Sequence, residues 1–223
     1  MDAQAFSAEE YDEEIRRTLP HYDEFFSRIR TAVRAHFGDT PVDWLDIGCG
    51  TGRVAAEVLQ TLPVRSFTFA DASRQMLDIA ESRFQNAPVP VRFLQSRAEN
   101  PFGQNAYDVV TSVLVNHYLD GEERTAAYAR AYDALRAGGL YLFFENYDPV
   151  TAEERARLRA EWIDFQKGKG KSAQQAEEHL ARWNRAYFPK KLSVLIPLLR
   201  QVGFARTEIF CRSCLQIGIL AEK

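Results

Sequence analysis

The stretch that decides the fold is Val42-Asp43-Trp44-Leu45-Asp46-Ile47-Gly48-Cys49-Gly50-Thr51-Gly52-Arg53. Its first half is a short apolar run with the length of a buried strand in a parallel sheet. Its second half has glycines at alternate positions, which permit a tight turn and let a ligand approach bare backbone. A helix is predicted to follow at 54–59, and its N-terminal amides point at the same space. The stretch therefore predicts a nucleotide-type site at the carboxyl end of the first strand.

The glycine spacing departs from the dinucleotide-binding pattern G-x-G-x-x-G. Arg53 stands where the third glycine would be, and Gly52 comes one residue early. The strand also ends in Asp46, whose carboxylate would repel a diphosphate but suits an ammonium or sulfonium group. A cationic nucleoside is therefore the favoured ligand. A glycine turn without a ligand and a nicotinamide-dinucleotide site are weaker alternatives.

Bulk composition favours one soluble domain. The chain has 223 residues, a hydrophobic share of 46% and a formal net charge of −3. This length and apolar content predict a single domain over 1–223 with a full core. The net charge argues against nucleic acid as the main partner, although local basic patches are compatible with it. We expect a cytoplasmic monomer or homodimer, because no apolar run reaches membrane-spanning length and the N-terminus is acidic.

The cysteines favour a reducing compartment and no metal. There are three of them, an odd number in a chain of this length. Cys211 and Cys214 spell C-x-x-C, but structural zinc needs four ligands and no second pair exists. We therefore expect the pair to be structural.

Periodicity predicts alternating strands and helices along the chain. Predicted helices lie within 7–37 (interrupted at Pro20), and at 54–59, 122–135, 153–165, 172–188 and 192–202. Predicted strands lie at 42–47, 65–70, 91–95, 107–114, 140–144, 205–211 and 215–221. Ser7 and Glu10 are predicted to form a capping box, Ala137-Gly138-Gly139 to end the helix at 122–135, and Pro197 to break the last helix.

The segment Leu45-Asp46-Ile47-Gly48-Cys49-Gly50-Thr51-Gly52 resembles the first motif of class I S-adenosylmethionine (SAM)-dependent methyltransferases. This resemblance implies a Rossmann-like α/β fold, with a seven-stranded, mostly parallel sheet and helices on both faces. It also implies SAM as the cofactor and SN2 transfer of its methyl group to an acceptor, for which a small molecule is the default. Residues 1–40 would form an N-terminal helical cap, and 148–189 a helical lid insert.

The resemblance implies cofactor contacts from several motifs. Asp46 and the glycine loop would hold the methionine end, and Asp71, at the end of the second strand, would accept hydrogen bonds from the ribose hydroxyls. The residues expected to bind the cofactor are Asp46, Gly48, Cys49, Gly50, Gly52, Arg53, Asp71, Ala72, Met76, Arg97, Ala98, Glu99, Ser112 and Val113.

The adenine contacts depart from the family pattern. Many members have Gly-Asp-Ala after the third strand, where this chain has Ser96-Arg97-Ala98. Arg97 cannot accept a hydrogen bond from the adenine amino group. Three alternatives stay open: the backbone around Ala98 contacts the adenine, Glu99 replaces the missing acid, or Arg97 stacks on the ring.

Residues after the fourth and fifth strands are candidates for the reacting centre. Asn116 and His117 follow the fourth strand, and His117 is either a base or a packing residue beneath the cofactor. Positive and aromatic groups at 182–187 suit recognition of a carboxylate or phosphate, unless they are surface arginines around a core tryptophan. The residues expected to contact the acceptor are Tyr11, Tyr22, Glu145, Tyr147, Arg182 and Arg185.

Two further segments, at 11–22 and 162–168, resemble the carboxy-SAM synthases and their methyltransferase relatives. That resemblance implies an alternative function: a transferase that acts on SAM in tRNA wobble-uridine modification. Synthases of this branch hold the added carboxylate with an arginine on the insert, and Arg182 lies nearest to that position. A non-catalytic SAM-binding module is the remaining alternative.

Overall fold

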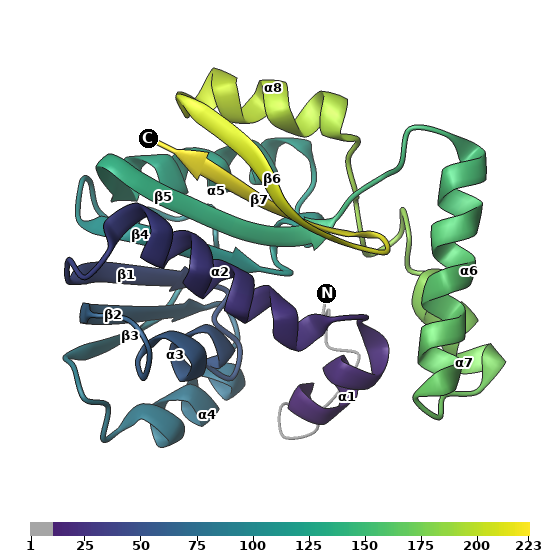
Figure 1. Cartoon of the computed structure of the whole chain (residues 1–223), viewed down its shortest axis with the longest axis horizontal. Coiled ribbons are helices and arrows are strands. Elements are labelled where there is room, and N and C mark those ends of the chain that lie inside the picture. The colour runs from purple at the N-terminus through teal and green to yellow at the C-terminus, as the bar shows by residue number, and fades with distance from the viewer. Residues whose placement is uncertain (1–10) are drawn as a thin grey trace.

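The computed structural model describes residues 11–223 as a seven-stranded sheet with helices on both faces (Figure 1). The strands follow the order β3-β2-β1-β4-β5-β7-β6. Strands β1 to β5 run parallel, and β7 is antiparallel to both β5 and β6. The predicted Rossmann-like, mostly parallel fold is confirmed. The predicted capping box of Ser7 and Glu10 lies outside the described residues.

The strand order places a switch point at the end of β1. Its neighbours β2 and β4 lie on opposite sides, and the connections that follow β1 and β4 leave in opposite directions, which opens a crevice at the carboxyl edge. The strands are β1 (Val42–Ile47), β2 (Val64–Asp71), β3 (Val91–Gln95), β4 (Tyr107–Val113), β5 (Leu135–Asn146), β6 (Arg206–Ser213) and β7 (Gln216–Glu222).

Aromatic packing fixes the helices to the two faces of the sheet. Phe25 from α2 stacks on Phe144 of β5 with ring centroids 4.2 Å apart, and Tyr128 from α5 packs against Phe143 on the other face at 5.5 Å. One face carries α2 (Tyr22–Phe37), α3 (Arg53–Val58) and α4 (Arg74–Phe84); the other carries α5 (Gly121–Ala134) and α8 (Leu192–Val202) (Figure 1).

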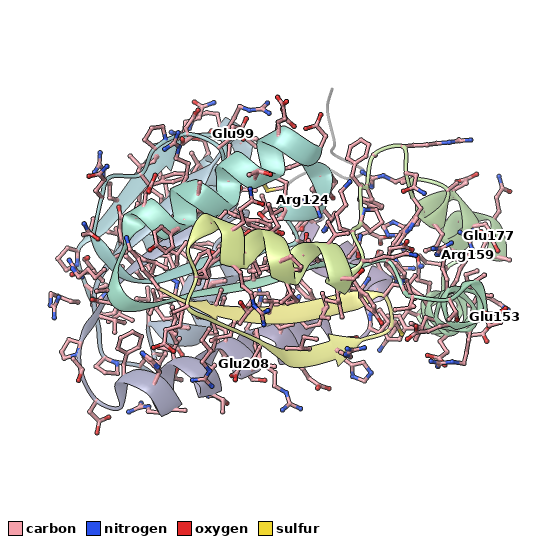
Figure 2. The ribbon with its side chains drawn as sticks, turned by 90° about the horizontal axis from the view of Figure 1, so that it is seen from above. Glu99, Arg124, Glu153, Arg159, Glu177 and Glu208 are labelled. Carbon is pink, nitrogen blue, oxygen red and sulfur yellow. The ribbon has the colours of Figure 1, made fainter. Side chains whose placement is uncertain are left out.

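Three helices lie beyond the carboxyl edge of the sheet. They are α1 (Tyr11–Thr18), α6 (Ala152–Gly168) and α7 (Ala173–Leu180), and α1 lies between the sheet and the α6–α7 pair (Figure 1). Arg159 of α6 and Glu177 of α7 form an ion pair at 2.7 Å (Figure 2). The indole nitrogen of Trp162 donates to the Thr18 carbonyl at 2.6 Å, which attaches the insert to α1.

Three predictions about helix ends were wrong. The helix predicted at 172–188 ends at Leu180, because the following residues form turns in which the Asn184 amide donates to the Tyr187 carbonyl. Helix α5 ends at Ala134, since Leu135 already pairs with Tyr107 in the sheet. Helix α8 runs unbroken through Pro197, which removes only one backbone donor.

Candidate functional site

The glycine loop after β1 is shaped by close packing at two positions and left bare at a third. Gly48, Gly50 and Gly52 all have positive φ angles, of 67°, 54° and 85°. A Cβ at Gly48 would lie 2.1 Å from the Val115 side chain, and one at Gly52 would lie 2.5 Å from Phe84. A Cβ at Gly50 would meet nothing within 4 Å. The loop therefore presents open backbone at Gly50.

Asp46 is a buried carboxylate with one unused oxygen. Its side chain is 1% exposed, and Oδ1 accepts from the Thr111 hydroxyl at 2.7 Å. Oδ2 has no hydrogen-bond partner. Burial raises the pKa of Asp46 to about 7; the Thr111 bond opposes this rise, and Asp71 adds to it. A cationic group beside Oδ2 would satisfy both the missing bond and the buried charge.

Asp71 is held rigidly at the end of β2. Its Oδ2 accepts from the Gly50 amide and its Oδ1 from the Ser73 amide, both at 2.8 Å. Burial raises the pKa of Asp71, although these amide bonds favour its charged form. Each carboxylate oxygen keeps further acceptor capacity, so the two hydroxyls of a ribose fit here.

These groups line one small cavity, whose volume is about 30 Å³. Ligand pockets typically measure about 300–1,000 Å³. The cavity is lined by Tyr11, Tyr22, Phe26, Asp46, Gly48, Cys49, Gly50, Thr51, Arg53, Val54 and Val113. Side chains from α1 and α2 thus cover the glycine loop, and a nucleoside as large as SAM enters only when α1 moves.

Asp12 attaches α1 to the glycine loop. Its Oδ1 accepts from the Thr51 hydroxyl at 2.5 Å, and its Oδ2 lies 2.6 Å from an Arg83 guanidinium nitrogen. The same Arg83 nitrogen donates to the Thr51 carbonyl at 3.1 Å. Neither Asp12 nor Arg83 was predicted, because an acid in a first helical turn and a surface arginine carry no distinctive sequence signal.

The residues expected around the adenine occupy different environments. Met76 and Ala98 are buried, whereas Ala72 is exposed. Arg97 pairs with Glu99 and, at 3.0 Å, with Glu123 on α5. Glu99, labelled in Figure 2, keeps a buried Oε2 without a hydrogen-bond partner. Its free acceptor favours Glu99 among the three alternatives, which stay predictions.

Three expected site residues point toward α5, away from the cavity. Ser112 pairs in register with Phe143, and alternation along β4 puts its side chain on the face opposite to Val113. The Asn116 side chain donates to the Tyr141 hydroxyl at 2.9 Å. Glu145 is fully buried and contacts Arg124 at 3.4 Å. The geometry gives these side chains a structural role.

His117 is placed as a neutral donor, which counts against the predicted base. Its Nδ1 accepts from the Asn146 amide at 3.3 Å, so the proton of the neutral ring sits on Nε2. Burial lowers the pKa of His117 well below its usual range, and Arg124 and Arg182 add to this effect. A ring in this tautomer donates at Nε2.

The remaining acceptor candidates separate in space. Tyr11 and Tyr22 line the cavity. Tyr147 is buried beneath the Arg212 guanidinium, which lies 5.8 Å from its ring centroid. Arg182 lies over the Tyr187 ring at 4.5 Å, whereas Arg185 is exposed.

Two further features of residues 11–223 bear on the chemistry. Within this range, no three His, Cys, Asp or Glu side chains are grouped so that they could hold a metal ion, and Cys211 and Cys214 are free thiols. None of the described helices combines the length and the apolar composition that crossing a membrane requires.

The sheet order, the glycine loop and the carboxylates that end β1 and β2 define the class I SAM-dependent methyltransferase fold. Residues 45–139 match the family described as Methyltransferase domain. The resemblance to class I SAM-dependent methyltransferases is therefore confirmed.

Relatives agree with this class. A malonyl-[acyl-carrier protein] O-methyltransferase from Halalkalibacterium halodurans is 35% identical over 52% of this chain and 43% of its own length. A carboxy-S-adenosyl-L-methionine synthase from Aeromonas hydrophila is 24% identical over 92% of this chain and 82% of its own. The crystal structure of a SAM-dependent methyltransferase from Clostridium acetobutylicum covers 96% of both chains at TM-score 0.67 and 15% identity. This chain thus spans less than half of the first relative.

Proposed function

We propose that this protein is a SAM-dependent methyltransferase that acts on a small-molecule acceptor. The observation that carries the proposal is the buried Oδ2 of Asp46, which lacks a partner and faces a cavity lined by the glycine loop. The ammonium of the SAM methionine moiety would supply that partner, and the ribose would bind at Asp71. Bound SAM supplies a methyl group made electrophilic by the adjacent sulfonium.

The chain itself would contribute binding and alignment. An SN2 transfer needs the acceptor in line with the methyl group and water kept away. Tyr11 and Tyr22 cover the cavity from α1 and α2, so they would exclude water there. No described residue is placed as a base, since His117 is a neutral donor. The reaction would then suit an acceptor that is already nucleophilic.

The test is calorimetric binding of S-adenosylhomocysteine (SAH). Asp46→Asn removes the charge but keeps an acceptor for Thr111, so we expect SAH affinity to fall about 10–100-fold, as for a lost charge-assisted bond. Asp78→Asn, an exposed aspartate on α4, is the matched control and should bind as wild type. Absence of SAH and SAM binding to the wild-type protein would refute the proposal.

A carboxy-SAM synthase activity is the second candidate. It is supported by the alignment with the Aeromonas synthase, which extends over 92% of this chain. Native mass spectrometry of the purified protein separates the candidates. A retained ligand heavier than SAM by one carboxylate group would favour the synthase, and retained SAM or SAH would favour the methyltransferase.

A further inference from the structure

We propose that the acceptor carries a carboxylate, and that Arg182 binds this group together with the hydroxyls of Tyr118 and Tyr187. These three residues are called the anion cluster below. The inference rests on the proposed methyltransferase function, because it concerns the acceptor of the same site.

The anion cluster is held in place by backbone bonds between the insert and the chain after β4. The Phe188 amide donates to the His117 carbonyl at 2.7 Å. The Arg124 guanidinium donates to the Phe188 carbonyl, also at 2.7 Å, from the end of α5 that faces the insert (Figure 2). The turn at 182–188 is therefore fixed against η1 (Asn116–Tyr118), where the chain leaves the carboxyl edge of β4.

Tyr187 is the centre of the cluster. Its ring centroid lies 5.1 Å from that of His117 and 5.3 Å from that of Tyr118. The Arg182 guanidinium lies 4.5 Å from the same centroid. Both Arg182 and the Tyr187 hydroxyl interact with the Tyr118 hydroxyl. A guanidinium that stacks by its face keeps its N–H donors in the plane of the group, where they can bind two oxygens at once.

The cluster adjoins the cofactor cavity through Tyr11. This side chain lines the cavity beside Asp46 and Gly48. Burial raises the pKa of the Tyr11 hydroxyl, and its charged or ionisable neighbours add to the rise. Those neighbours include Tyr118 and Tyr187 from the cluster and Asp71 from the cofactor site. A group bound at the cluster would thus lie next to the reacting end of the cofactor.

The charge of the cluster selects an anion. Arg182 is positive, and Tyr118 and Tyr187 keep their protons because burial raises the pKa of both hydroxyls. The neighbouring His117 and His179 are neutral, mainly through burial, and Arg182 contributes in both cases. An ammonium here would meet repulsion. One guanidinium with two hydroxyl donors matches the single charge and two oxygens of a carboxylate.

The experiment uses the full chain saturated with SAH and titrated with malonate, with acetamide as the uncharged probe. Wild type should bind malonate but not acetamide, as measured by calorimetry and thermal shift. Arg182→Gln should weaken malonate binding about 10–100-fold, and Arg182→Lys should weaken it less, because the charge remains but the fork is lost. Arg185→Gln is the matched control from the same turn; its exposed side chain lies outside the cluster.

SAH binding separates the two levels of the argument. Failure of wild type to bind SAH would refute the methyltransferase proposal itself. Normal SAH binding with equal responses to malonate and acetamide, or with unchanged malonate affinity in both Arg182 variants, would overturn the carboxylate assignment alone. Stronger binding of inorganic phosphate than of malonate would also overturn it.

Discussion

Asp46 is the residue on which the site depends, and it is costly to the folded protein. It is buried, bonded through one oxygen only, and its pKa is raised to about 7 from an ordinary value of 3.8. Between about pH 4 and 7, the native state therefore binds more protons at this position than the unfolded state, and this group makes the ligand-free protein less stable as the pH rises. A strained carboxylate of this kind is common at binding sites.

The ionisation of Asp46 predicts a pH dependence of cofactor binding. A ligand ammonium binds the ionised carboxylate, so SAH affinity should rise about tenfold from pH 6 to pH 8, as the raised pKa is crossed. Calorimetry at about pH 6, 7 and 8 measures this trend. The Asp46→Asn variant should bind weakly with no such trend, and an affinity that falls with rising pH in wild type would contradict the assignment.

Glu145 illustrates a buried charge with a structural role. Its carboxylate lies 3.4 Å from Arg124, and the Tyr128 hydroxyl donates to it at 2.9 Å. Glu145→Gln leaves the Arg124 guanidinium buried without its counter-charge, so we expect a loss of about 3–5 kcal/mol in the free energy of unfolding. Urea denaturation measures it. Glu208→Gln on the exposed edge strand is the control; equal stability of the two variants would show that the buried pair contributes little.

At the scale of elements, α1 acts as a cover over the cofactor site. The cavity beneath it is about 30 Å³, and Asp12 holds the helix to Thr51 and Arg83. The cover must open before a nucleoside enters, so the rate of association depends on how strongly Asp12 holds the helix closed.

Removal of the Asp12 contacts should speed ligand association. Two lost bonds of about 1–2 kcal/mol in total raise the open population about 5–30-fold, and Asp12→Ala should accelerate SAH association by a similar factor in stopped-flow measurements. Glu13→Ala, an exposed acid on the same helix, is the control. Identical association rates in Asp12→Ala and wild type would show that α1 does not limit entry.

At the scale of the whole molecule, α1 connects the cofactor loop to the insert. Asp12 contacts the loop, while Glu14 and Thr18 contact Lys171, which lies 2.6 Å from each. The Lys171 side chain is only 6% exposed. A displacement of α1 by the cofactor would therefore reach the insert through buried contacts.

Loss of the Lys171 contacts should loosen both partners together. Lys171→Met removes a buried charge that holds Glu14, and hydrogen exchange should accelerate about 5–30-fold in both α1 and the α6–α7 pair. Lys167→Met, on the half-exposed surface of α6, should leave exchange in α1 unchanged. Faster exchange confined to the insert would contradict a connection through α1.

Local sequence signals predicted the strands, the glycine loop and the two carboxylates well. A strand that ends in Asp46 and runs into three spaced glycines has few other solutions, because only glycine accepts positive φ beside the packed Val115 and Phe84 side chains. The alternation of strands and helices then implied the parallel sheet. Helix ends were less predictable, because tertiary pairing at Leu135 and the turn at 182–187 override local propensity.

The sequence by itself determined the class of fold and the cofactor-facing residues, because they sit in one contiguous segment whose backbone geometry its own residues impose. Only the tertiary structure decided which side chains meet from distant segments. It placed Ser112, Asn116 and Glu145 on the α5 face, and brought Asp12 to Thr51 and Arg182 to Tyr118. Such contacts depend on strand register and on how α1 and the insert pack, and no local pattern encodes these.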